Sequence, residues 1–304
     1  MKLNHIRDVI AVAERGSLRS AARHLGIAQP AITRSIRELE HELGAALFVR
    51  HVNGVVLTPM GEAFLRRATA IQLELERTKD EIQQLKGIKT GTVAVGLSTA
   101  VHVALLPRVL RPFSRSFPEV QLKIVEGLFP AMEAELYDGS IDFYVGPLAE
   151  DSASSEFAVE KLFDNHRMVV ARRNHPLAHA RSLADLTGAK WVTTSVTVSS
   201  DAELGPVFGR FKLPVPKVAV KAQTGLSMLI IAAYSDFLCM VPRQWLDFAK
   251  AGRLLTHIDV REELAAPSIC IVRRARLPLT PVAEQLSDLF RRAAAHHMAA
   301  THPA

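Results

Sequence analysis

The chain has 304 residues, 48% of them hydrophobic, and its 37 Lys and Arg against 31 Asp and Glu give a net charge of +6. This length allows two or three domains, and the positive charge favours a polyanionic partner. No apolar run reaches the roughly 18 residues of a membrane helix, and the amphipathic first residues do not resemble a signal peptide. The sequence therefore predicts a cytoplasmic protein with no membrane partner.

A first helix is predicted from the helical spacing of apolar residues between Leu3 and Ala13, ending near Gly16. The next stretch, residues 17–43, predicts two short helices joined by a tight turn. Ser17 is a suitable N-cap for the first of them, and Gly26 can adopt the left-handed conformation that ends it. The second helix is expected to begin around Gln29 and Pro30, because proline is tolerated in a first turn.

Charge divides the second of these helices into two halves. Five arginines and no acid lie between Arg15 and Arg37, and then Glu38, Glu40 and Glu42 follow. A helix that is basic at its N-terminal end suits contact with DNA phosphates and base edges. The alternative is an ordinary helical hairpin with a solvated charged face.

A short hairpin is predicted directly after this pair of helices. Two β-rich arms, residues 47–49 and 55–57, flank the sequence His51-Val52-Asn53-Gly54, and Asn-Gly is a strong turn signal. Three helices followed by a hairpin make a winged helix-turn-helix, whose wing can touch the DNA backbone.

A long helix is predicted from Pro59 to Lys86, capped by Thr58 and roughly 42 Å long at about 1.5 Å per residue. Its apolar residues alternate spacings of four and three, which is a heptad seam. The seam predicts pairing with the same helix of a second subunit, giving a dimer that reads a two-fold DNA site. Packing against its own domain is the alternative. The predicted dimerisation residues are Phe64, Ala68, Ile71, Leu75, Ile82 and Leu85.

The remainder of the chain alternates strands and helices, which predicts an α/β domain with a mostly parallel sheet. Predicted strands cover residues 91–98, 120–127, 141–146, 156–163, 166–173, 191–194, 215–220, 236–241 and 268–274, with helices at 101–116, 130–138, 201–211, 225–234 and 281–298. Enough strands are present for two sheets, and the chain is expected to leave a first subdomain near residue 161 and return near 266. Cys239 and Cys270 lie in apolar runs and are expected to be buried strand residues, whereas the histidine-rich end after Ala293 is expected to be a disordered tail.

The N-terminal part of the chain contains a sequence pattern that is typical of a known protein family. The segment AARHLGIAQPAITRSIRELEHELGAALFVR, followed by GVVLTPMGEAF, resembles the N-terminal domain of LysR-type transcriptional regulators over residues 3–85. The part from Gly91 onward resembles the effector-binding domain of that family more loosely. Within the family the chain looks most similar to the toluenesulfonate-regulator and galactose-binding-protein-regulator branch.

The resemblance implies an α/β fold class: an N-terminal winged helix-turn-helix, a long linker helix, and a periplasmic-binding-protein-like effector domain of two α/β subdomains. The implied domains are residues 1–58, 59–87 and 88–304. Subdomain I comprises residues 88–160 and 266–300, and subdomain II comprises residues 161–265. The family also implies a homotetramer, formed as a dimer of dimers, that binds double-stranded promoter DNA and a small-molecule effector and acts on RNA polymerase.

Carried over by position, the DNA-contacting residues are Ser17, Gln29, Pro30, Thr33, Arg34, Arg37 and Arg50. Their chemistry agrees, because Gln suits adenine and Arg suits guanine or phosphate in the major groove. Two departures from the family pattern weaken the expected phosphate contacts. Ala28 stands where many relatives have Ser, and the wing tip at His51 lacks the usual second basic residue.

The effector site is expected where hydroxyl-rich strand ends meet helix N-termini, an arrangement that binds carboxylates, sulfonates and similar anions. The expected residues are Ser98, Thr99, Ala100, Phe129, Val145, Gly146, Pro147, Thr194, Ser195, Val196, Thr197 and Thr224. The alternative is that these hydroxyls only cap helices, and both roles can coexist.

No motif supports catalysis or metal binding, so the sequence predicts a protein that is not an enzyme and needs no cofactor or metal. His166, His175 and His179 lack metal-ligand spacing with acids or cysteines and are expected in a solvated loop. Two rivals remain: a solute-binding module, which would leave residues 1–58 without a role, and an enzyme on an α/β scaffold, which would need a nucleophile or cofactor motif.

Overall fold

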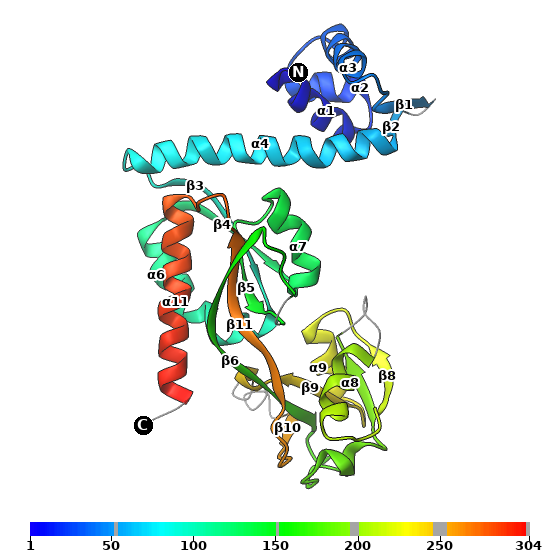
Figure 1. The fold of residues 1–304 in the computed structure, drawn as a ribbon, viewed down its shortest axis with the longest axis vertical. Helices are drawn as coiled ribbons and strands as arrows, with labels where there is room; N and C mark the ends of the chain where they lie inside the picture. The colour runs from blue at the N-terminus through cyan, green and yellow to red at the C-terminus, as the bar shows by residue number, and fades with distance from the viewer. Residues whose placement is uncertain (52–53, 150–151, 195–200, 246–253, 302–304) are drawn as a thin grey trace.

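The computed structural model describes residues 1–51, 54–149, 152–194, 201–245 and 254–301. The N-terminal helices lie over one end of a long helix, and the α/β part of the chain extends away from the other side of that helix (Figure 1). Subdomain I lies next to the long helix, and subdomain II lies at the far end of the molecule.

The N-terminal domain has the predicted three helices and hairpin. Its elements are α1 (Leu3–Arg15), α2 (Leu18–Leu25), α3 (Gln29–Leu43), β1 (Phe48–His51) and β2 (Gly54–Leu57). Both predicted ends of α2 are confirmed. The Ser17 hydroxyl caps the helix by accepting a hydrogen bond from the Ser20 amide, and Gly26 ends it with a φ of 67°. Apolar faces of all three helices form one core, which includes Val9, Ile32 and Leu39.

Helix α4 (Pro59–Leu85) begins with Pro at its first position, after the cap that Thr58 provides. The Thr58 Oγ1 accepts from the Gly61 amide at 2.9 Å and donates to the Ala46 carbonyl at 2.7 Å. A Cβ on Gly61 would collide with the Leu47 carbonyl oxygen. The start of α4 therefore packs closely against the base of the wing.

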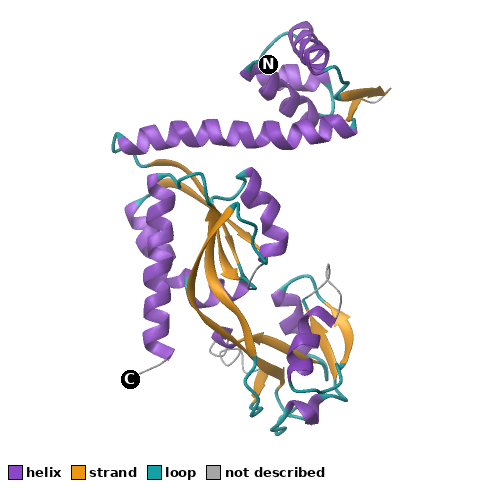
Figure 2. Cartoon of the chain, viewed as in Figure 1, coloured by secondary structure: helices purple, strands orange, loops and turns teal. Residues whose placement is uncertain are grey.

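Subdomain I is a sheet covered by helices on both faces (Figure 2). Before the strands that lead to subdomain II it contains β3 (Thr90–Leu97), α5 (Thr99–Ala104), α6 (Leu106–Ser116), β4 (Glu119–Glu126), α7 (Phe129–Asp138) and β5 (Phe143–Pro147). A single helix was expected over residues 101–116, but α5 ends at Ala104 and α6 starts at Leu106. Pro107 in the first turn of α6 lacks the amide hydrogen and clashes sterically with a continued helix, which explains the break.

Subdomain II is a smaller α/β unit. After β6 it contains η1 (Leu183–Leu186), β7 (Lys190–Thr193), α8 (Asp201–Arg210), β8 (Lys217–Lys221), α9 (Gly225–Ala233), β9 (Leu238–Pro242), η2 (Arg243–Trp245) and β10 (Leu255–Ile258). Strand β10, which was not predicted from the sequence, pairs with β6.

Two long strands, β6 (Phe157–Arg172) and β11 (Ala265–Arg274), connect the subdomains. Two separate strands were predicted where β6 runs unbroken through Asp164 and Asn165. Both side chains have partners that let the strand continue: Asp164 accepts from the Ser268 hydroxyl at 3.0 Å, and Asn165 accepts from the Gln244 amide at 3.1 Å.

The sheet is mixed rather than mostly parallel. Its strand order is β4-β3-β5-β11-β6-β9-β7-β8, with β10 also on β6. Pairs within each outer part are parallel, whereas every pair that involves β6 or β11 is antiparallel. The two crossing strands run in opposite directions because the chain uses one to leave subdomain I and the other to return.

Both faces of each half-sheet carry a separate core. In subdomain II, the core under α8 includes Val169 and Trp191, and the core under α9 includes Val170 and Met228. The two cysteines are free and buried, as expected, with Cys239 on β9 and Cys270 on β11.

The C-terminal segment forms α11 (Pro281–Thr301) and is not a disordered tail over its described length. Phe290 is fully buried in the core of subdomain I, and the His297 ring lies 5.2 Å from the Phe163 ring. Such packing orders the end of the chain, and His302 lies beyond the described residues. Among the described residues no helix is long and apolar enough to span a membrane.

Candidate DNA-binding face and effector site

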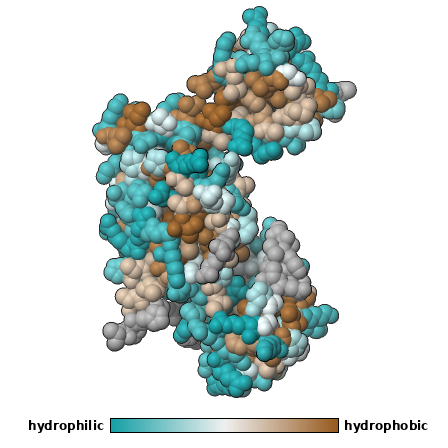
Figure 3. All heavy atoms as spheres, in the orientation of Figure 1, coloured by the Kyte–Doolittle hydropathy of each residue, from teal (hydrophilic) through white to brown (hydrophobic). Residues whose placement is uncertain are grey.

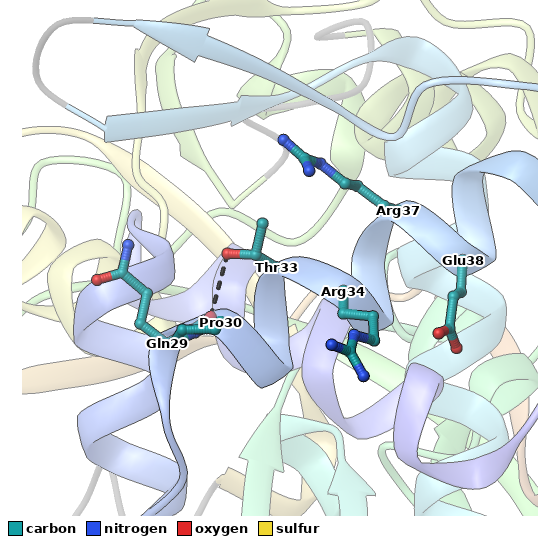
Figure 4. Close-up of a pocket in the computed structure, with 6 residues that line it drawn as sticks. All are labelled: Gln29, Pro30, Thr33, Arg34, Arg37 and Glu38. Atoms are coloured by element: carbon teal, nitrogen blue, oxygen red, sulfur yellow. Dashed lines mark hydrogen bonds between the residues drawn. The ribbon is translucent and has the colours of Figure 1, made fainter.

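One exposed face of α3 brings together five of the seven predicted DNA-contacting residues; Ser17 caps α2 and Arg50 lies on β1. An open groove is lined by Gln29, Pro30, Thr33, Arg34, Arg37 and Glu38, all of them from this helix (Figure 4). The Thr33 hydroxyl donates to the Gln29 carbonyl at 3.0 Å. Arg34 and Arg37 are exposed and form no ion pair with any described residue, so both can meet phosphates or bases.

The opposite, apolar face of α3 fixes how the exposed face is presented. Ile32 and Leu39 are fully buried in the core of the N-terminal domain. Successive residues of a helix lie about 100° apart, so burial of Ile32 and Leu39 leaves Arg34 and Arg37 on the exposed side. The helix has Ala28 at its N-cap with no side-chain cap, which agrees with the departure noted in the sequence.

The wing lies beside this face and is held by two contacts. The Glu40 carboxylate of α3 accepts from the amides of Leu47 and Phe48 at 2.8 and 3.2 Å. The Val55 amide donates to the Gly16 carbonyl in the turn between α1 and α2 at 2.9 Å. Arg50 is exposed on β1, and Val52 and Asn53 lie outside the described residues.

The predicted seam of α4 divides into two parts. Ala68 is buried and Phe64 packs against the N-terminal core, so the alternative of packing within the chain holds for these two positions. The later large residues of the seam, namely Ile71, Leu75, Ile82 and Leu85, are exposed. Hydrophobic surface along α4 is visible in Figure 3.

Polar groups on α4 attach it to subdomain I. Arg77 Nε donates to Asp142 Oδ1 at 2.8 Å, and Arg77 Nη2 donates to the Gly139 carbonyl. Burial raises the pKa of the Asp142 carboxyl above its ordinary value, and the positive charge of Arg77 opposes this rise. Gln84 donates to the Thr90 carbonyl and accepts from the Val282 amide, at 3.1 and 3.0 Å.

The hydroxyls predicted for the effector site in subdomain I already have partners. The Ser98 side chain is buried and accepts from the Val101 amide at 3.4 Å as the cap of α5. Thr99 donates from its hydroxyl to the Glu126 carboxylate at 3.0 Å. Ala100, Phe129 and Val145 are buried core residues. Helix capping accounts for Ser98.

Gly146 and Pro147 end β5 next to these residues. A Cβ on Gly146 would collide with the Tyr144 hydroxyl and come within 2.9 Å of the Ser98 Cβ. Tyr144 is fully buried, and burial raises the pKa of its hydroxyl above the ordinary value. Tyr144 was not predicted as a site residue, because its apolar strand context indicated only a core position.

In subdomain II, Thr194 follows β7 and its amide donates to the Glu203 carboxylate at 3.2 Å. The Thr224 hydroxyl caps α9 by accepting from the Ser227 amide at 3.2 Å. Three further predicted residues, Ser195, Val196 and Thr197, lie outside the described residues.

The two subdomains touch where these strand ends meet. The Trp245 indole Nε1 donates to the Thr99 carbonyl at 3.3 Å. A Cβ on Gly225 would come within 2.6 Å of the Trp245 ring and 3.3 Å of the Thr99 side chain. The structure therefore brings Thr99 of subdomain I close to the N-terminus of α9, whose cap is Thr224. Trp245 was not predicted as a junction residue, because an isolated tryptophan after a strand was its only signal.

No described residues form a group of three His, Cys, Asp or Glu side chains that could hold a metal ion. Of the three histidines expected in a solvated loop, His175 is buried; it accepts from the Leu177 amide and donates to the Asp236 carbonyl. His166 lies on β6, where it pairs with the exposed Glu263 at 2.8 Å. Their sequence context gave no indication of these distant partners.

Comparison with known proteins agrees with this arrangement. Residues 3–62 match the model of the bacterial regulatory helix-turn-helix protein, lysR family, and residues 86–295 match the LysR substrate binding domain. The regulator TdcA of Escherichia coli K12 is 25% identical over 290 residues, covering 95% of this chain and 92% of TdcA. GbpR of Rhizobium radiobacter is also 25% identical, covering 88% of this chain and 87% of GbpR. The predicted placement in the GbpR branch stays a prediction, because TdcA is equally similar.

Solved structures share the fold. CbnR in complex with its target DNA superimposes with a TM-score of 0.72 at 21% identity, covering 96% of this chain and all of CbnR. A full-length OxyR variant of Pseudomonas aeruginosa gives 0.69 at 19% identity, covering 97% of this chain and 94% of OxyR. The two family models together span almost the entire chain, and this protein belongs to the LysR family of transcriptional regulators.

Proposed function

We propose that the chain binds double-stranded promoter DNA as a homo-oligomer, a dimer of dimers, and responds to a small organic anion at the junction of subdomains I and II. The exposed basic face of α3 carries the DNA-binding part of this proposal, because its arginines lack internal partners among the described residues. The wing and the α1–α2 turn lie beside it and offer additional backbone contacts.

The exposed apolar residues of α4 support the oligomer. Four large side chains between Ile71 and Leu85 repeat at heptad spacing on a helix whose polar face is already attached to subdomain I. A second copy of α4 offers the same pattern in return, so the interface would be two-fold. Two DNA-binding domains joined in this way would read two half-sites.

The proposed output is control of RNA polymerase. The subdomain junction is a contact between units joined by two strands, and a ligand there can change their relative tilt. Because α4 is attached to subdomain I, a change of tilt would alter the spacing of paired subunits on the DNA. A change in that spacing would change the bend of the DNA. The altered bend would in turn change how well RNA polymerase reaches the promoter.

DNA footprinting with the full chain tests this function. Duplexes selected from a random pool should give a two-fold protected pattern, and binding should weaken steeply with salt as phosphate contacts release counterions. An active small molecule should shift the footprint. A protein that protects no selected duplex would contradict the DNA-binding proposal, and a footprint that no effector moves would contradict the change of spacing.

A solute-binding module without a regulatory role remains the alternative. It gives no function to the exposed arginines of α3 or to the helix that joins them to subdomain I.

A further inference from the structure

The exposed groove of α3 contains one acid among its polar and basic residues. Glu38 is the last residue along the helix to line it, after Arg34 and Arg37. Arg34 precedes Glu38 by four residues, so the two side chains project from the same side of the helix (Figure 4). The Glu38 side chain is 50% exposed. A carboxylate in this position repels DNA phosphates and competes with them for Arg34.

His5 of α1 is the buried neighbour of Glu38. It is 3% exposed, and neither of its ring nitrogens forms a hydrogen bond with a described residue. Its Nε2 lies 3.8 Å from Glu38 Oε2, which is within ion-pair distance but longer than a hydrogen bond. Glu38 forms no other ion pair with the described residues. The Glu38 carboxylate therefore lies between a buried imidazole and the surface proposed to face DNA.

The other charged groups near His5 come from α1 and α3. On α1, Asp8 is buried, and its Oδ1 already lies 2.7 Å from Arg7 Nη2. On α3, the charge of Glu42 interacts with that of His5 and of Lys2, but Glu42 already binds the amino group of the first residue. No described residue of α2, the wing or α4 forms an ion pair with His5. A charge on His5 would therefore act mainly on Glu38.

The protonation state of His5 determines what Glu38 does. Histidine is the side chain that ordinarily changes its charge between pH 5 and 8. A neutral imidazole leaves the Glu38 carboxylate uncompensated and able to turn toward Arg34. A protonated imidazole is a cation at ion-pair distance from Glu38, so it compensates the carboxylate and attracts it toward α1.

We propose that His5 is a positioning residue that controls the charge of the α3 groove through Glu38. Protonated His5 holds Glu38 in an ion pair, which leaves Arg34 available to DNA and compensates one charge that repels phosphates. The affinity of the chain for DNA therefore rises as the pH falls from about 8 to about 6. This inference rests on the DNA-binding part of the proposed function and adds pH to the effector as a second signal.

Fluorescence anisotropy of the full chain with one selected duplex, at pH 8 and pH 6 and equal ionic strength, tests the proposal. At pH 8, Glu38→Gln should bind about fivefold more tightly than the wild type, because it removes the uncompensated charge. At pH 6, the two proteins should bind within about twofold of each other, because His5 already compensates Glu38. The difference at pH 8 should shrink as salt is added.

His5→Gln should give the opposite pattern, because glutamine is polar but cannot become charged. It should match the wild type at pH 8 and bind about fivefold more weakly at pH 6. The double variant His5→Gln/Glu38→Gln should bind as Glu38→Gln does at both pH values. His41→Gln is the matched control, since it removes an exposed histidine three residues after Glu38 on the same helix. It should keep the pH dependence of the wild type.

Three results would overturn the proposal: Glu38→Gln gains no affinity at pH 8, it gains equally at both pH values, or His5→Gln keeps the pH dependence of the wild type. If His5→Gln lost its cooperative melting transition, the comparison of Glu38→Gln with the wild type at the two pH values would still decide. A wild type that binds the duplex without these differences would contradict only this inference. A wild type that binds no selected duplex at either pH would contradict the proposed function as well.

Discussion

The Arg77 guanidinium and the Asp142 carboxylate join the linker helix to subdomain I, with Nε 2.8 Å from Oδ1. Asp142 also accepts from the Ala94 amide at 2.8 Å and precedes β5, whose far end carries Gly146 and Pro147 at the subdomain junction. Arg77 contacts the Gly139 carbonyl as well, where α7 ends. Arg77 of α4 thus binds the start of β5, through Asp142, and the end of α7, through Gly139. The opposite ends of β5 and α7 lie at the predicted effector site.

Arg77→Met should destabilise the chain in a pH-dependent way. Loss of one partner of a buried ion pair costs about 3–5 kcal/mol. Burial already raises the pKa of Asp142, so the folded state binds this proton more readily than the unfolded state does. The stability that this gives is present at low pH and is lost as pH rises through the folded pKa. Without Arg77 this pKa rises further. Denaturant unfolding should therefore show a larger loss at pH 7.5 than at pH 4.5.

Its control is Arg111→Met, at an exposed arginine of α6, which should change the free energy of unfolding little at either pH. Adding Asp142→Asn to Arg77→Met should recover part of the loss at pH 7.5. A loss that is equal at both pH values would show that the charge of Asp142 is not the cause.

Arg34→Ala should weaken binding to a selected duplex by about 1–3 kcal/mol if Arg34 reads a base, and should relax preference at one position of the site. Its exposure on α3 without an ion pair to any described residue supports this role. Fluorescence anisotropy with site and scrambled duplexes measures both effects. Arg111→Ala is the control, because it also removes one exposed arginine. If both variants weakened binding equally, Arg34 would contribute only its positive charge and would not read a base.

Leu75→Glu should dissociate the α4 pair, because it places a charge at the centre of the exposed apolar seam. Sedimentation velocity should show a smaller species than the wild type. Gln83→Glu adds the same charge about 100° around the helix from Ile82 and should leave the mass unchanged. An unaltered sedimentation coefficient for Leu75→Glu would refute the helix pairing.

The features that the sequence predicted well are those set by residues close together in the chain. Ser17, Gly26 and Thr58 act on residues three or four positions away, and the structure shows these caps as expected. The grouping of Gln29, Pro30, Thr33, Arg34 and Arg37 on one face was also predictable, since a single helix carries them. The continuous strand β6 was not, because Asp164 and Asn165 look like a turn until the side chains of Ser268 and Gln244 are known to meet them.

The effector region was harder to predict for the same reason. Its groups come from strand ends far apart in sequence, and a hydroxyl at such an end caps a helix as readily as it binds a ligand. Ser98 and Thr224 proved to be caps. Tyr144 lies inside an apolar strand pattern, so only the three-dimensional structure reveals that its hydroxyl occupies the space that a Cβ on Gly146 would fill.

Gly225→Ala should disturb the contact between the subdomains. Alanine normally favours a helix over glycine by about 0.5–1 kcal/mol. Here the added Cβ would come within 2.6 Å of the Trp245 ring, so overpacking should instead destabilise the chain by about 1–3 kcal/mol. Displacement of that ring would also weaken its hydrogen bond to the Thr99 carbonyl. In a Trp191→Phe background, fluorescence should report a more solvated Trp245.

Gly209→Ala is the matched control for that substitution. Gly209 also lies in a helix of subdomain II, and a Cβ there would meet nothing within 4 Å. This variant should be neutral or stabilising by up to about 1 kcal/mol, because only helix propensity changes. If Gly225→Ala were equally benign and left the emission of Trp245 unchanged, the indole would have room to move, and the contact with Thr99 would not be what holds the two subdomains in this arrangement.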